Sequence, residues 1–276
     1  MGRPCLTLPG LRCRGGWLLA AAAAGALLLP ALAAEEAQEA PAAPLEAETP
    51  TCAPSRARRP VEETAEQPLA LESAQPASGA DYRHRLRPTH LGWARLDHWC
   101  VWVEPAATEG PAQLWDQRWL AALERALGQW QQELAITRVE DPAAAQVRIL
   151  RRRPPLLRDP SGRTRASHGR AQLAVVAVER GAGWILEPQV QVLISPGQRA
   201  AASEATALHE LGHAFGLWGH SDDPADAMAA IPGARPVLEL SPRDRATVRW
   251  LYQQPTRFGQ PLPSPASGQE AAPASP

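Results

Sequence analysis

The sequence predicts an α/β domain of the α+β kind, in which a mixed, twisted sheet is combined with two long helices and a shorter helix near the carboxy terminus. Three observations lead to this class: short runs rich in β-branched residues, one long segment with apolar residues at helical spacing, and two later helix-start patterns. These features fall between residues 89 and 258, which we take as one domain of about 170 residues.

The first half of this domain is predicted to contain one strand, one long helix and then several strands. Apolar residues alternate from Trp99 to Val103, which predicts the opening strand. Trp115, Trp119 and Leu123 begin an apolar stripe at helical spacing, which predicts the first long helix over residues 114–134. The remaining strands are predicted over residues 136–139, 147–150, 173–178 and 190–194.

Two helices are predicted to follow these strands. The residues Ser195-Pro196-Gly197-Gln198 have the form of a helix start, with serine as the cap, proline in the first turn and glutamine three residues after the cap. We expect this second long helix to end near Phe215, because Gly216 can adopt the positive φ that terminates a helix. Ser241 is expected to cap the last helix, over residues 242–252.

Both ends of the chain are predicted to lie outside the domain. Three arginines precede an uncharged, partly apolar run that ends in small residues, which is the layout of a cleaved secretory signal peptide over residues 1–34. Residues 35–88, rich in Ala, Pro and Glu, predict a disordered linker, and residues 259–276 a disordered tail. We therefore expect an exported protein, secreted, periplasmic or extracellular, with no stable membrane insertion once the signal is cleaved.

The charge balance and the cysteines narrow the choice of function. The chain has 28 basic and 29 acidic residues, a net charge of −1, and so lacks the positive excess that nucleic-acid binding requires. We therefore expect no nucleic-acid partner.

Two of the four cysteines lie in the predicted signal peptide, while Cys52 lies in the predicted linker and Cys100 in the opening strand. No disulfide framework is predicted, and Cys52 is interpreted as a free thiol.

The second long helix carries residues with the spacing of a metal site. In His209-Glu210-Leu211-Gly212-His213 the two histidines are four residues apart, so both imidazoles can point at one zinc ion from one face of a helix. Glu210 follows the first histidine directly and is long enough to reach a water on that metal, as a general base must. The pentad therefore predicts a catalytic metal site.

A catalytic zinc ion requires three protein ligands and one open position. After the helix ends at Gly216, the next imidazole in the chain belongs to His220, which we take as the third ligand. An oxygen of Asp222 or Asp223 is an alternative ligand, and Glu239 is a more distant one.

The string HELGHAFGLWGHS, residues 209–221, resembles the zinc signature HExxHxxGxxH of the metzincin metalloproteases. It is most similar to the matrixin branch, in which a serine follows the third histidine and a methionine turn lies beneath the metal. The resemblance implies a matrixin-like catalytic domain and leaves a calcium requirement open. It assigns one catalytic zinc ion to His209, His213 and His220, the general base to Glu210, and the floor of the site to Met228.

The sequence departs from this signature before the third ligand. The family has its third histidine six residues after the second, whereas His220 follows His213 by seven residues. Gly219 is the apparent one-residue insertion, and we expect a glycine to absorb the extra residue as a bulge. Many relatives also have a tyrosine directly after the methionine, where this chain has Ala229.

Together these residues predict a zinc metalloendopeptidase, a hydrolase that acts as a monomer on protein or peptide substrates. The alternative is a catalytically silent protein that keeps the metzincin fold and binds peptides. We expect an extended substrate to add as a strand at a sheet edge formed by residues 173–178, and the loop over residues 231–240 to shape the specificity pocket. A Cys52 thiolate on the metal would impose latency, but its neighbours lack the pattern found in the family.

Overall fold

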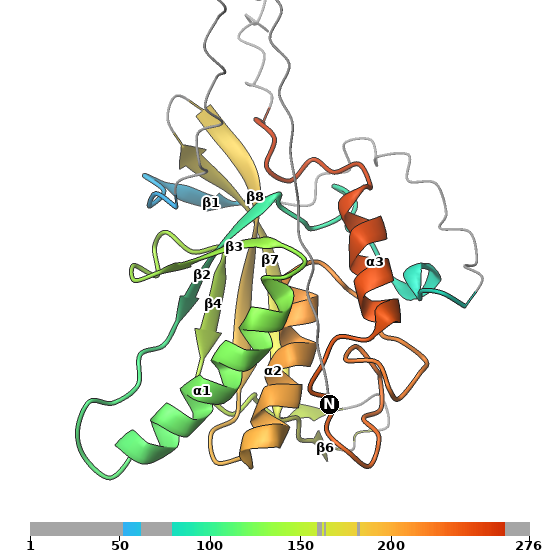
Figure 1. Ribbon diagram of the computed structural model, residues 1–276. Helices are drawn as coiled ribbons and strands as arrows, with labels where there is room; N and C mark the ends of the chain where they lie inside the picture. Colours follow the sequence, from blue (N-terminus) through green and yellow to red (C-terminus); the bar gives the residue numbers. More distant parts are fainter. Residues whose placement is uncertain (1–51, 62–78, 159–161, 163, 181–182, 263–276) are drawn as a thin grey trace, which may run out of the picture. The chain divides into compact units, whose positions relative to one another are not determined.

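A six-stranded mixed sheet and three α-helices are the main elements of the described part of the chain, which confirms the predicted α+β class (Figure 1). The structure, a computed structural model, describes residues 52–61, 79–158, 162, 164–180 and 183–262. The signal peptide expected over residues 1–34 and most of the expected tail lie outside the described residues. Among the helices that are described, none has the length and apolar character needed to cross a bilayer.

The main sheet consists of β1 (Arg58–Pro60), β2 (His98–Val103), β3 (Ala135–Val139), β4 (Val147–Leu150), β7 (Gly169–Arg180) and β8 (Gly183–Ile194). Its order is β1-β7-β8-β4-β2-β3. The four strands from β8 to β3 are parallel, whereas β7 forms an antiparallel hairpin with β8, and β1 pairs antiparallel with β7. A separate two-stranded ladder joins β5 (Leu157–Arg158) and β6 (Thr164–Arg165).

The helices are α1 (Gln113–Trp130), α2 (Ala200–Ala214) and α3 (Pro242–Tyr252), preceded in the chain by a 3-10 helix, η1 (Arg83–Arg85). Helices α1 and α2 lie side by side along one face of the sheet (Figure 1). α3 begins at its predicted cap, where Ser241 and Asp244 exchange hydrogen bonds of 3.0 Å and 2.9 Å in a capping box.

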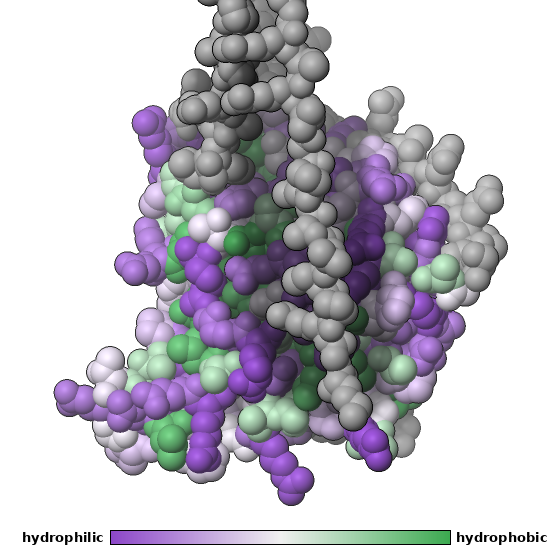
Figure 2. All heavy atoms as spheres, in the orientation of Figure 1, coloured by the Kyte–Doolittle hydropathy of each residue, from purple (hydrophilic) through white to green (hydrophobic). Residues whose placement is uncertain are grey.

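Aromatic side chains join the helices to the sheet. Trp99 of β2 and Trp130 of α1 are fully buried, and both pack edge-on against Phe215 at the end of α2. The indole nitrogen of Trp130 donates to the carbonyl oxygen of Leu208, at 3.1 Å, and so fixes α1 against the middle of α2. Figure 2 shows mostly hydrophilic side chains on the outer face drawn there, with apolar ones in small patches between them.

The second long helix begins later than predicted. Ser195 still belongs to the sheet side of the chain, because its N–H donates to the carbonyl oxygen of His168 at 2.8 Å. Gly197 then turns the chain with a φ of +78°, and helical geometry begins only at Ala200. The prediction of Ser195 as the helix cap is therefore wrong. The predicted end is confirmed, since Gly216 has a φ of +105° directly after the helix.

Two parts of the segment expected to be a linker contribute to the fold. Residues 58–60 form β1, and Tyr82 and Leu86 are buried in the core. Cys52 forms a disulfide with Cys100 of β2, although the two are 48 residues apart in the sequence. The interpretation of Cys52 as a free thiol is therefore wrong, and its sulfur is not a thiolate that could impose latency.

The strand β1 also covers part of the edge at which we expected a substrate. Residues 58–60 pair with residues 176–178 of β7, and the N–H of Val61 donates to the carbonyl oxygen of Val175 at 3.2 Å. The prediction of a free edge over residues 173–178 is therefore wrong for its second half. Among the described strands, the outer edge of β7 is without a partner over residues 169–174.

Candidate metal centre

Helix α2 presents two of the candidate ligands to the loop that carries the third. Leu208 and Leu211 are fully buried and seat the helix in the core. This orientation turns His209 and His213, one helical turn apart, towards His220. One ring nitrogen from each of the three imidazoles lies within 4.8 Å of the others. The structure thus brings together the three histidines that were predicted from the sequence.

Hydrogen bonds to the backbone fix the orientation of the two helix histidines. Nδ1 of His209 is 2.8 Å from the carbonyl oxygen of Ala227, and Nδ1 of His213 is 2.8 Å from that of Leu217. A carbonyl oxygen can only accept, so each Nδ1 carries the proton and donates it. Each Nε2 is then left with a lone pair, which is the form of imidazole that binds a metal.

The spacing of the ring nitrogens shows whether zinc fits. Nε2 of His213 and Nε2 of His220 are 3.2 Å apart. Two nitrogens on one tetrahedral zinc ion, at ordinary bond lengths, are about 3.3 Å apart. Because Nε2 of His213 carries a lone pair, so close an approach is favourable only with a cation or a proton between the two nitrogens. The donor set and its spacing therefore fit a zinc ion.

Burial keeps these histidines neutral. It lowers the pKa of His213 to about 3, and the neighbouring His209 and His220 act in the same direction. Burial also lowers the pKa of His209 and of His220. Since a metal ion binds only neutral imidazole, few protons have to be displaced from this site at neutral pH.

Glu210 lies beside the histidines with only 8% of its surface exposed. Burial raises its pKa to about 7, although a hydrogen bond from the Ala171 N–H and the charge of Arg170 act against this rise. Gly169, at the start of β7, is so close that a Cβ there would lie 2.6 Å from Oε1 of Glu210. A carboxyl group with this pKa can accept and return a proton near neutral pH, as a general base must.

Met228 packs directly under the part of α2 that lies between the two histidines. Its side chain is fully buried. A Cβ on Gly212 would lie 2.2 Å from the sulfur of Met228, so any larger residue at this position would displace the methionine side chain. The residue expected as the floor of the site thus lies against the helix that carries the ligands.

Asp244 of α3 holds the methionine turn in place and was missed by the sequence analysis. Its fully buried carboxylate accepts a hydrogen bond from the N–H of Ala227 at 2.8 Å and another from the hydroxyl of Tyr82 at 2.7 Å. The carbonyl oxygen of Ala227 in turn accepts from His209. The one signal in the sequence was the position of Asp244, three residues after the cap Ser241, where a capping box carries its carboxylate.

The alternative third ligands are engaged elsewhere. Asp222 and Asp223 both pair with Arg243, with N–O distances of 2.9 Å and 3.6 Å. Glu239 is exposed and does not belong to the group of potential ligands found among the described residues around the two helix histidines. The geometry therefore supports His220 as the third ligand.

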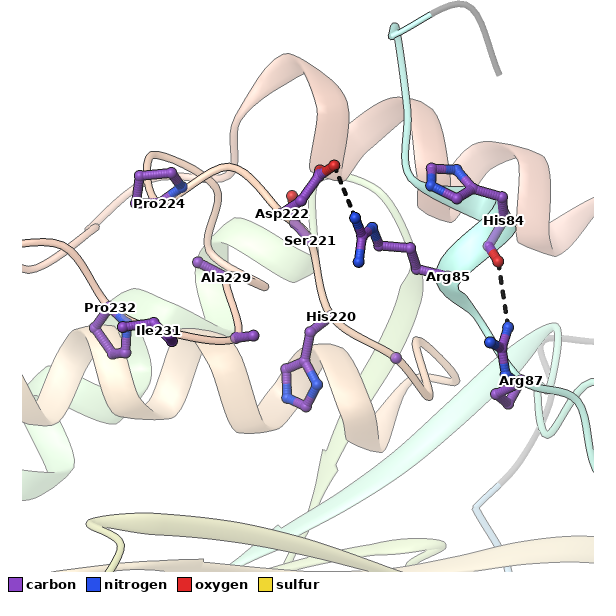
Figure 3. Close-up of a pocket in the computed structure, with 12 residues that line it drawn as sticks. His84, Arg85, Arg87, His220, Ser221, Asp222, Pro224, Ala229, Ile231 and Pro232 are labelled. Atoms are coloured by element: carbon purple, nitrogen blue, oxygen red, sulfur yellow. Dashed lines mark hydrogen bonds and ion pairs between the residues drawn. The ribbon is translucent and has the colours of Figure 1, made fainter. Parts of the chain in front are cut away.

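A pocket of about 950 Å³ opens beside His220 (Figure 3). Residues 229–232 line one side, including Ile231 and Pro232 from the loop that was expected to shape a specificity pocket. Residues of the segment 84–87 line the opposite side, and His220 lies between the two. The sequence analysis missed this second wall, because it placed residues 35–88 in a linker.

The bulge at Gly219 stays a prediction, but the structure gives a separate reason for a glycine at this position. Its φ is not positive, unlike that of Gly216. A Cβ on Gly219 would instead lie 2.3 Å from the carbonyl oxygen of Arg85, which is backbone and cannot easily move away. The glycine is therefore needed for the close approach of the segment that forms the second wall of the pocket.

The fold and the histidine group define the class of protein. The domain has a mixed sheet with an antiparallel edge strand, and the helix packed against this sheet carries two imidazoles placed to bind a metal. This is the arrangement of a zinc metallopeptidase domain. Comparison with protein families then identifies the family. Residues 107–253 match the family model described as matrixin, so the chain belongs to the matrixin family, as the zinc signature predicted. This family is zinc-dependent and acts on peptides. No curated protein matches the sequence.

Proposed function

We propose that the chain is an exported zinc-dependent endopeptidase in which His209, His213 and His220 hold one zinc ion and Glu210 is the general base. The observation that carries this proposal is the convergence of three imidazole nitrogens beside a buried carboxyl group. Membership of the matrixin family supports the same class of reaction. When bound, zinc supplies the Lewis acidity that polarises a peptide carbonyl group and lowers the pKa of water.

Glu210 is proposed to carry the proton through the reaction. Its carboxylate takes a proton from the attacking water and later returns it to the nitrogen of the leaving amine. A pKa of about 7 makes both transfers feasible at one pH, because neither form of the carboxyl group is strongly favoured there. The N–H of Ala171, which bonds to this carboxylate, holds it towards the start of β7. An extended peptide could add there, along the free edge over residues 169–174.

Export and a monomeric state complete the proposal. The layout of the first 34 residues supports a signal peptide, and the disulfide between Cys52 and Cys100 supports an oxidising compartment outside the cytosol. The candidate ligands and Glu210 all come from one chain, so a single copy is sufficient to form the site.

The substitution Glu210→Ala tests the mechanism. The variant is expected to keep a stoichiometric amount of zinc, while its cleavage of a mixed peptide library falls by a factor of about 100 or more. The matched control is Glu204→Ala on the same helix, where the glutamate is also largely buried but pairs with Arg125, and it should retain cleavage.

Three outcomes would decide between the candidate functions. Loss of wild-type cleavage on chelation, and its return on addition of zinc, is expected for the enzyme. Wild-type rates in Glu210→Ala would remove this residue from the mechanism. A zinc-loaded wild-type protein that binds peptides and cleaves none of them would favour the catalytically silent peptide-binding protein.

A further inference from the structure

The pocket beside His220 has a basic wall that the proposed mechanism does not use. Its side chains are His84, Arg85 and Arg87, all from the segment around η1, as Figure 3 shows. Asp222 is the single acidic residue among those that line the pocket in the described part of the chain. The opposite wall, residues 229–232, carries no charged side chain. The pocket therefore combines a basic wall with an uncharged one, next to a proposed metal ligand.

Arg85 has an acidic partner, whereas Arg87 has none among the described residues. Oδ2 of Asp222 pairs with Arg85 at 3.1 Å and its Oδ1 with Arg243 at 2.9 Å, and Arg243 also pairs with Asp223 and Asp226. The guanidinium of Arg87 donates to backbone carbonyl oxygens and pairs with no acidic side chain in the described part of the chain. The uncompensated positive charge at the pocket is therefore that of Arg87.

The backbone of the basic wall is held in place by the loop that precedes His220. Gly219 lies in close contact with the backbone of Arg85, and the N–H of Arg87 donates to the carbonyl oxygen of Trp218 at 2.8 Å. On the other side, buried Tyr82 anchors the start of the same segment in the core. The position of the backbone at Arg85 and Arg87 relative to His220 is thus set by the fold, which reduces the entropy lost when a ligand binds.

We propose that this pocket binds an acidic side chain, Asp or Glu, of the peptide substrate, an inference that rests on the proposed peptidase function. A carboxylate in the pocket supplies the negative charge that Arg87 lacks, through charge-assisted hydrogen bonds from the guanidinium groups of Arg87 and Arg85. The uncharged wall formed by Ala229, Ala230 and Ile231 contacts the methylene groups of the same side chain. The substrate class is therefore a peptide with an acidic residue close to the cleaved bond.

Binding to zinc-loaded Glu210→Ala protein tests this proposal without cleavage of the probe. The probes are fluorescein-labelled octapeptide amides, random except for one fixed Glu or one fixed Gln, which is moved through the central positions. Fluorescence anisotropy is expected to show about fivefold tighter binding of the Glu pool at the preferred position. The preference should decline at high salt, because exposed charges are screened.

Variants of the wall assign the preference to its residues. Arg87→Gln and the double variant Arg85→Gln/Arg87→Gln should reduce the ratio of Glu to Gln binding towards one, whereas Arg138→Gln, a control on β3, should not. Equal binding of the two pools at every position, or a preference that survives in the double variant, would overturn the proposal. A parallel set of octapeptides with a free carboxy terminus shows whether the pocket binds a terminal carboxylate instead, and tighter binding confined to that set would also overturn the proposal.

The same peptides separate this proposal from the proposed function. Wild-type protein that cleaves the pools without any preference for Glu would leave the peptidase function standing and overturn the acidic pocket. Wild-type protein that shows the binding preference but cleaves no peptide would support the pocket and contradict the peptidase.

Discussion

Replacing Asp244 by asparagine would test how α3 supports the metal centre. One carboxylate oxygen accepts from the N–H groups of Ala227 and Ser241, and the other from the hydroxyl of Tyr82 and, at 3.4 Å, from the N–H of Met228. Asparagine keeps only one oxygen, and its NH₂ group cannot accept from the remaining donors. The substitution also removes the charge that strengthens all of these hydrogen bonds.

The expected loss in stability follows from these contacts. A hydrogen bond to a charged group contributes about 1.5 to 3 kcal/mol, and a neutral one about 1 kcal/mol. With one pair of hydrogen bonds weakened and the other disrupted, Asp244→Asn should lower the free energy of unfolding by about 2 to 4 kcal/mol. Tyr82→Phe removes a single hydrogen bond and should lower it by about 1 kcal/mol. The effects of the two substitutions should not be additive, because the residues are in contact.

The assay has two parts. Urea denaturation of the metal-free protein, followed by tryptophan fluorescence, gives the stability without a contribution from bound zinc. Competition with a chelator gives the zinc affinity, which should fall about tenfold in Asp244→Asn, because the turn it holds provides the carbonyl oxygen that orients His209. A variant with wild-type stability and wild-type zinc affinity would refute this reasoning.

Two further predictions concern the amino-terminal segment. Replacing both Cys52 and Cys100 by serine should lower the free energy of unfolding by about 2 to 4 kcal/mol, because the unfolded chain gains freedom; an unchanged urea midpoint would contradict this. Burial alone would raise the pKa of Asp81, but hydrogen bonds from Arg83 outweigh it and hold the pKa below its usual 3.8. The interaction between Asp81 and Arg83 thus stabilises the folded protein above about pH 4, and this contribution is lost as the pH falls through the pKa of Asp81 in the folded state. Asp81→Asn should be less stable by about 1 kcal/mol at pH 7, with a difference that disappears in acid; a difference that stays constant on acidification would show that Asp81 does not cause it.

The parts of the site that could be predicted depend on local geometry. His209 and His213 are four residues apart on a helix, and the pitch of any α-helix places their rings together. The end of α2 was equally predictable, because the chain adopts a positive φ at Gly216, and few residues other than glycine adopt a positive φ. The start of the same helix was not, since a strand-like hydrogen bond from Ser195 competes with helix formation there.

The parts that could not be predicted depend on contacts between distant segments. Nothing in the sequence around Cys52 indicates that β2 lies beside it, and composition alone placed residues 52–61 in a linker. The basic wall of the pocket was missed for the same reason. Tyr82 and Leu86 were the only local signals that residues 79–88 pack into the core, and two large side chains do not stand out within a polar, proline-rich stretch.

The short strand β1 has a consequence for association between copies of the protein. At the edge of a sheet, a strand of twelve residues such as β7 exposes backbone N–H and C=O groups with which a strand of another chain could pair. β1 pairs with three residues of this edge, and the segment that carries β1 is joined to strand β2 of the same sheet by the disulfide between Cys52 and Cys100. The free part of the edge is thereby shortened to a length suited to a short extended peptide. Residues that by composition look least structured thus reduce the length of sheet edge that is available for pairing with a second copy.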